Sequence, residues 1–78
     1  MERRLKTTIA AVLGLDPDAV KDDASPETIA EWDSVKQMDI VLAVEDEFDV
    51  RFDDNVIATL ASYVLIRDEL ASLGVAAT

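Results

Sequence analysis

A serine preceded by an acid, Asp33-Ser34, is the pair in this chain best suited to covalent chemistry. A serine hydroxyl becomes a catalytic nucleophile only when a neighbouring base activates it, and that base is most often histidine. The 78-residue sequence has no histidine and no cysteine, which excludes a Ser-His-Asp triad, a Cys-His pair and the common zinc sites. Two interpretations of Ser34 remain: a point of covalent attachment, and a helix cap with no chemistry of its own.

Other common ligand sites also fail on residue type. Gly14 and Gly74 are the only glycines, so neither a P-loop nor a dinucleotide-binding loop can form. An EF-hand loop that started at Asp16 would place Val20 and Lys21 where calcium needs an oxygen ligand and a glycine. We therefore expect no metal site and no catalysis by this chain alone.

Hydrophobic spacing predicts a small all-α, four-helix bundle of three main helices and one short helix, with a long loop between the first two. A single domain should span residues 1–78, with an ordered core at about 2–73 and a frayed end at 75–78. Within the loop, single turns at 16–20 and 26–29 should let Val20, Ile29 and Trp32 pin the chain to the core. The sequence predicts a helix at 2–14, a loop from Leu15 to Asp33, and a helix at 34–48 capped by Asp33 or Ser34. A polar turn at 49–54 with Val50 and Phe52 pointing inward should follow, then a helical turn at 54–58 and a helix that Thr59 caps and that runs to Leu73.

The helix at 34–48 has two apolar faces, although a small bundle needs only one. Its core face carries Ile40, Val41, Val44 and Phe48, with Gln37 among them. The opposite face carries the apolar residues Val35, Met38 and Leu42, flanked by the acids Asp39, Glu45 and Asp46. This second face either packs under the long loop or forms a docking surface with an apolar centre and an acidic rim.

Negative charge dominates the chain, whose formal net charge is −10. Fourteen of the seventeen acids lie between Asp16 and Asp54, opposed there only by Lys21, Lys36 and Arg51. Such a surface repels nucleic-acid phosphates and suits partners with basic surfaces. No apolar run is long enough for a membrane span or a signal peptide, so we expect a cytoplasmic monomer that does not insert into membranes.

The segment from Glu31 to Phe48, EWDSVKQMDIVLAVEDEF, resembles the phosphopantetheine-attachment segment of acyl carrier proteins. The family pattern is Asp-Ser-Leu, followed by an acidic amphipathic helix that ends in Glu-Glu-x-Phe. The match extends over nearly the whole chain and includes the helix that ends at Gly14-Leu15, the long loop and the final helix introduced by Thr59-Leu60.

This resemblance implies that a phosphopantetheinyl transferase attaches 4′-phosphopantetheine from coenzyme A to Ser34, with Asp33 supporting that step. The terminal thiol of the arm would then carry a substrate as a thioester for acyl-loading and acyl-processing enzymes. By the same resemblance, basic surfaces of these enzymes should contact a set of residues on the helix at 34–48: Val35, Met38, Asp39, Leu42, Glu45 and Asp46.

Several departures from the fatty-acid carrier pattern bear on the cargo. Val35 replaces the usual leucine, Lys36 stands where an acid is usual, and the segment from Phe52 to Thr59 is about one helical turn shorter. In the family that segment helps to line the pocket for the acyl chain, so the shorter version argues against a long cargo. Trp32 is typical of carriers from specialised pathways, or serves simply as a core anchor for the loop.

Three functions are therefore open at this point. The first is a stand-alone acyl carrier for polyketide-type, secondary-metabolite or fatty-acid synthesis. The second is a peptidyl or aminoacyl carrier, against which the dense acidic charge of the helix argues mildly. The third is an unmodified acidic interaction module in which Ser34 is only a cap.

Overall fold

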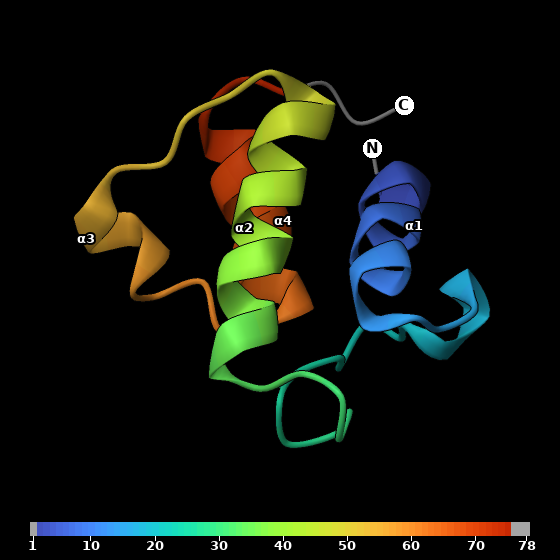
Figure 1. The fold of residues 1–78 in the computed structure, drawn as a ribbon. Helices are drawn as coiled ribbons and strands as arrows, with labels where there is room; N and C mark the ends of the chain where they lie inside the picture. Colours follow the sequence, from blue (N-terminus) through green and yellow to red (C-terminus); the bar gives the residue numbers. More distant parts are fainter. Residues whose placement is uncertain (1, 76–78) are drawn as a thin grey trace.

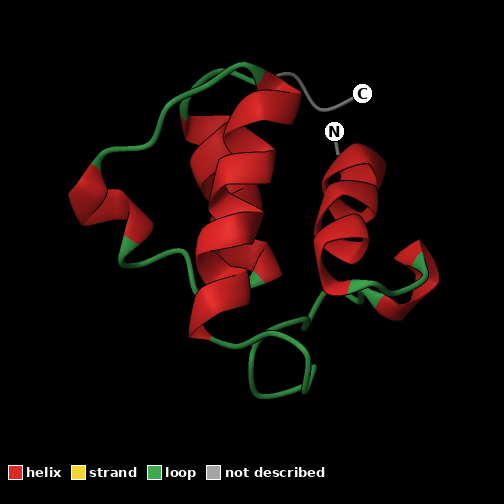
Figure 2. Ribbon diagram, viewed as in Figure 1, coloured by secondary structure: helices red, strands yellow, loops and turns green. Residues whose placement is uncertain are grey.

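The structure, a computed structural model, describes residues 2–75 and is helical without strands over that range (Figures 1 and 2). The predicted all-α bundle of three main helices and one short helix is confirmed. In chain order, the helical segments are α1 (Glu2–Leu13), the 3₁₀ turn η1 (Pro17–Ala19), α2 (Ser34–Phe48), α3 (Asp54–Ile57) and α4 (Tyr63–Ser72).

Helix α1 packs against α2 and also contacts α4. In Figure 1 the short helix α3 stands on the side of α2 opposite α1, and the long loop joins the lower ends of α1 and α2. Within residues 2–75, no helix combines the length and apolar character that crossing a bilayer requires.

The ends of α1 and α2 follow from local capping chemistry. Gly14 adopts a φ of 71° after α1, and the amide of Leu15 donates to the Ala10 carbonyl at 2.9 Å. Glycine reaches this left-handed conformation at little cost because it has no Cβ. Asp49 ends α2 in the same conformation, with a φ of 54°, and the Val50 amide donates to the Glu45 carbonyl at 3.0 Å.

The predicted start of the last helix at Thr59 is wrong, because α4 begins at Tyr63. Ser62 is its N-cap, and the Ser62 hydroxyl accepts a hydrogen bond from the Leu65 amide at 3.2 Å. The Thr59 hydroxyl instead donates to the Val56 carbonyl at 2.7 Å, which closes the turn after α3. The chain between α3 and α4 is consequently a separate connection, and Leu60 is buried within it.

The long loop is anchored as its sequence predicts. Val20, Ile29 and Trp32 are all buried, and η1 and a turn at 25–29 provide its local structure. The amide of Tyr63 also donates to the Ala24 carbonyl at 2.9 Å, which ties the loop to the start of α4. The remaining core comes from Ala24 in the loop, Phe52 after α2, and buried residues of the three main helices: Leu5, Ile9, Ala10, Leu13, Ile40, Val41, Val44, Tyr63, Ile66 and Leu70.

The predicted fraying of residues 75–78 is wrong at Val75. This side chain is half-buried against the core, and its amide donates to the Leu70 carbonyl at 3.1 Å. Residues 76–78 lie outside the described part of the chain.

Tyr63 joins α4 to α1 through a buried ring with a polar tip. Its hydroxyl donates to a Glu2 carboxylate oxygen at 3.1 Å, and the Lys6 ammonium lies 5.2 Å from the ring centroid. The pKa of Tyr63 is raised from 10.0 to about 12, chiefly by burial of the ring and secondly by the hydrogen bond to Glu2. The folded state therefore holds the phenol proton over a pH range in which the unfolded chain releases it.

We predict that the free energy of unfolding declines as the pH rises from about 10 to about 12, by up to about 1.4 kcal/mol per pH unit. The stabilisation from Tyr63 is complete below pH 10 and is lost as the pH passes the folded-state pKa. Urea unfolding at several pH values should show this decline in the wild type and a shallower one in Tyr63→Phe, which has no phenol to titrate. Equal slopes in the two proteins would contradict the prediction.

Candidate functional site

Ser34 lies at the first turn of α2, and Asp33 supplies the cap. The Asp33 carboxylate accepts a hydrogen bond from the Lys36 amide at 2.8 Å, and the Asp33 carbonyl accepts from the Gln37 amide at 2.8 Å. The exposed Ser34 side chain is therefore not needed as the cap. The first amides of a helix carry partial positive charge, so a negatively charged group attached to Ser34 would be favoured there.

A cavity of about 390 Å³ lies beside Ser34, and we call it the Ser34 cavity. It is walled by the long loop, the first turn of α2, and the segment formed by α3 and its connection to α4. Its surface is almost entirely apolar. The lining residues are Pro26, Trp32, Asp33, Ser34, Gln37, Ile57, Ala58 and Ala61.

Two hydrogen bonds of Gln37 join the three segments that wall this cavity. The Trp32 indole N–H donates to Gln37 Oε1 at 2.7 Å, and Gln37 Nε2 donates to the Leu60 carbonyl. Gln37 falls on the core face, as its spacing predicts, but its partners were not foreseen. The sequence does offer one indication of such partners: Gln37 is a lone amide among apolar residues, and a buried polar group needs hydrogen-bond partners.

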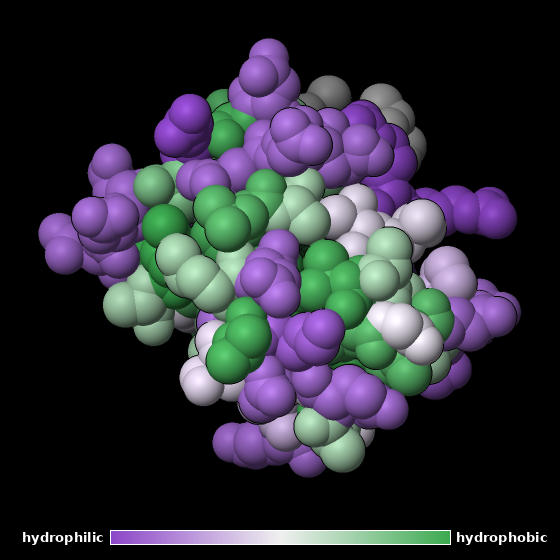
Figure 3. Space-filling model, viewed as in Figure 1, coloured by the Kyte–Doolittle hydropathy of each residue, from purple (hydrophilic) through white to green (hydrophobic). Residues whose placement is uncertain are grey.

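The opposite face of α2, which we call the outer face, is exposed and does not pack under the long loop. Its apolar side chains retain much of their accessible surface: 68% for Val35, 45% for Met38 and 54% for Leu42. Asp39 and Asp46 are exposed as well. In Figure 3, apolar patches lie over α2 and α3, with hydrophilic groups among and around them.

Glu45 differs from the other acids predicted on this face. Its carboxylate accepts a hydrogen bond from the Phe52 amide at 2.8 Å and is only partly exposed. Glu45 therefore fixes the chain that follows α2, in addition to contributing charge to the outer face.

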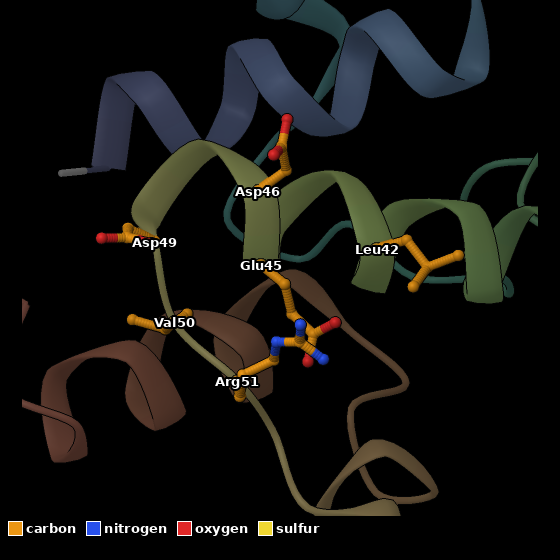
Figure 4. Close-up of a pocket in the computed structure, with 6 residues that line it drawn as sticks. All are labelled: Leu42, Glu45, Asp46, Asp49, Val50 and Arg51. Atoms are coloured by element: carbon orange, nitrogen blue, oxygen red, sulfur yellow. The ribbon is translucent and has the colours of Figure 1, made fainter.

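The outer face continues into a hollow of about 390 Å³ at the end of α2 (Figure 4). Leu42, Glu45 and Asp46 line it, together with three residues that sequence reasoning missed: Asp49, Val50 and Arg51. In Figure 4 the side chains of Glu45 and Arg51 point toward one another in the middle of the hollow. These additions follow from the left-handed turn at Asp49, which folds the chain back beside the helix.

This arrangement fits a negatively charged arm on Ser34 that continues into an apolar group. The hydroxyl is exposed at the positive end of a helix, and the adjoining cavity offers apolar walls to whatever the arm carries. Among the described residues, no histidine or cysteine side chain accompanies the serine, because the chain contains neither. The site can therefore hold a group but has no base of the usual kind to activate the serine.

Comparison with protein-family models gives a match to the model described as a phosphopantetheine attachment site. The match covers residues 3–68, which include α1, the long loop, all of α2 and α3, and the first half of α4.

Exposure of the outer face leads to a prediction about stability. Met38→Ala removes a side chain that is already half in solvent, so it should change the free energy of unfolding by less than about 0.5 kcal/mol. Ile40→Ala, two residues away on the core face, should lose about 2–5 kcal/mol because Ile40 is fully buried. Urea unfolding of both variants measures the difference, and equal losses would mean that Met38 is part of the core.

Proposed function

The chain belongs to the phosphopantetheine-attachment family, whose members bind 4′-phosphopantetheine covalently on a serine, and on that premise we propose that Ser34 is this serine. The observation that supports Ser34 most strongly is its position at the start of α2. Its exposed side chain lies at the start of α2, next to an apolar cavity, while Asp33 satisfies the helix cap.

The attachment reaction transfers phosphopantetheine from coenzyme A. The Ser34 oxygen bonds to the phosphorus that carries the pantetheine, adenosine 3′,5′-bisphosphate leaves, and the hydroxyl proton is released. Because the chain has no histidine to take up this proton, we expect the base to come from a phosphopantetheinyl transferase, with Asp33 supporting the step. When bound, the arm supplies a thiol that can hold a cargo as a thioester.

The protein serves as a carrier rather than as an enzyme. Tethering keeps the cargo at a high effective concentration near each partner active site that the arm can reach. The cavity beside Ser34 favours an acyl cargo over an aminoacyl one, because a charged amine loses hydration among apolar walls. We assign the protein to acyl transfer in a polyketide-type, secondary-metabolite or fatty-acid pathway, in which it acts as a cytoplasmic monomer.

The outer face of α2 is the docking surface for these enzymes. Val35, Met38 and Leu42 form its exposed apolar centre, and Asp39 and Asp46 supply exposed negative charge. Partners that fit it carry apolar side chains ringed by lysine or arginine, since complementary charge speeds encounter and sets orientation. Because Ser34 lies at one end of this face, docking there would bring the arm to the partner.

Modification of Ser34 is tested by intact mass after incubation with coenzyme A and a broad-specificity phosphopantetheinyl transferase. The wild type should gain one phosphopantetheinyl group. Ser34→Ala should gain none, yet its free energy of unfolding should change by less than about 0.5 kcal/mol because Asp33 retains the cap.

Ser72→Ala is the matched control, since Ser72 is also exposed and lies at the end of α4. It should be modified as fully as the wild type. Modification that persists in Ser34→Ala, or that disappears in Ser72→Ala, would overturn the assignment.

Charge reversal on the outer face should slow recognition by partners. Asp39→Lys and Asp46→Lys should each lower the second-order rate of modification about threefold to tenfold at low salt, with a smaller effect at high salt. Both side chains are exposed, so the fold should be retained.

Asp18→Lys changes the net charge equally but lies on η1, away from α2, and should leave the rate near the wild-type value. The same loss of rate in all three variants would mean that only net charge matters. The outer face would then have no special role in docking.

A further inference from the structure

Gln37 lines the Ser34 cavity one helical turn after Ser34, and we propose that its side chain sets the width of this cavity and so the longest uncharged acyl group that the cavity shelters. The proposal rests on attachment of the arm at Ser34. Gln37 acts as a positioning residue, because its effect on the cargo passes through the segments that its amide holds together.

The side-chain amide of Gln37 both accepts and donates a hydrogen bond, and the hydrogen-bonding character of each partner determines the orientation of the amide. The Trp32 indole nitrogen can only donate, so it must meet Oε1, and the Leu60 carbonyl can only accept, so it must meet Nε2. All three groups lie in a partly buried region where an unpaired amide would be costly. Gln37 is thus a two-sided clamp that no apolar residue and no carboxylate can replace.

The clamp holds two opposite walls of the cavity to the first turn of α2. Trp32 is itself a wall residue and is 2% exposed, so its ring cannot move outward without losing its bond to Gln37. On the other side, the Leu60 amide donates to the Ile57 carbonyl at 3.2 Å. Holding Leu60 therefore also holds the turn that places Ile57, Ala58 and Ala61 in the wall.

The buried Leu60 side chain and the hydrogen bond from Gln37 together hold the wall on the side of α3. Helix α3 is only four residues long and joins its neighbours through non-helical connections, and Ile57 and Ala58 are not fully buried. Short elements with few buried contacts open most easily. Loss of the bond from Gln37 would therefore loosen this wall and let the open apolar space of about 390 Å³ widen.

In the experiment, the protein is loaded with acyl groups of increasing length to find the longest group that the cavity still covers. Acetyl-, hexanoyl-, decanoyl-, tetradecanoyl- and octadecanoyl-coenzyme A, with a broad-specificity phosphopantetheinyl transferase, supply the series. Trp32 is the only tryptophan in the chain and lines the cavity, so its emission reports directly on the cargo. The melting temperature of each loaded form gives a second readout.

In the wild type, Trp32 emission and melting temperature should change with each added length up to a break and then stay constant. Gln37→Met keeps the length of the side chain but loses both hydrogen bonds, and its break should move to longer chains by at least one step of the series. Gln37→Glu keeps an acceptor for Trp32 but turns a carboxylate oxygen toward the Leu60 carbonyl, and it should shift the break in the same direction. This second variant carries the test if Gln37→Met does not fold.

Val41→Ala is the matched control, because Val41 is buried on the same helix but does not line the cavity. It should lower the melting temperature of every form while leaving the break where the wild type has it. An unchanged break in the folded Gln37 variants, the same shift in Val41→Ala, or no length dependence in the wild type would each overturn the role of Gln37. If the wild type accepted no acyl-phosphopantetheinyl group at all, the assignment of Ser34 would also be wrong. Intact mass shows whether the protein is loaded, and so separates this outcome from a failure of the role of Gln37 alone.

Discussion

Burial of Trp32 is the constraint on which the rest of the site depends. A loop from Gly14 to Asp33 can occupy many conformations, and only a strong apolar anchor close to its end can fix where α2 begins. The indole is 2% exposed and its N–H is bonded to Gln37, so the residue two positions before Ser34 is held on both its apolar and its polar side. The position of Ser34 relative to the core follows from this anchor, with the Asp33 cap completing the turn.

Three of the seven basic residues of this acidic protein form ion pairs that join parts of the fold: Arg4, Lys6 and Arg67. Arg4 donates to the Glu47 carbonyl at 2.8 Å and stacks over Phe48, which ties α1 to the end of α2. Lys6 pairs with Asp22 at 2.8 Å, and this contact lowers the pKa of Asp22 through the hydrogen bond and the attraction of the ammonium charge. Arg4 and Lys6 thus pair with acids at the end of α2 and in the long loop, and Arg67 pairs with Glu2 of α1. These ion pairs do not involve Asp39 or Asp46, whose charges on the outer face can attract basic partners.

Sequence patterns predict those features of the fold that depend on local spacing or on a single residue type. The period of Ile40, Val44 and Phe48 marks the core side of α2, and the stop at Gly14 marks the end of α1, because both depend on neighbours within a few residues. The start of α4 was missed because Thr59 and Ser62 are both acceptable caps, and only tertiary packing of the α3 turn decides between them. The Gln37 clamp and the carboxylate contact of Glu45 with the Phe52 amide also join segments whose approach no local pattern reveals.

Ser34 lies where two apolar surfaces of α2 approach each other, so a cargo tethered to it can reach either surface. On one side is the Ser34 cavity, which is open to solvent, and on the other is the exposed face that begins at Val35. The free energy falls when an apolar group on a flexible arm leaves water, whether the group enters the cavity or a partner's active site. A cavity that bound the cargo too strongly would oppose its delivery, since the partner has to compensate for the contacts that are lost. A cavity that is open to solvent and held in shape by hydrogen bonds therefore suits a carrier, because it shields the cargo in part between partners and retains it only weakly when one docks.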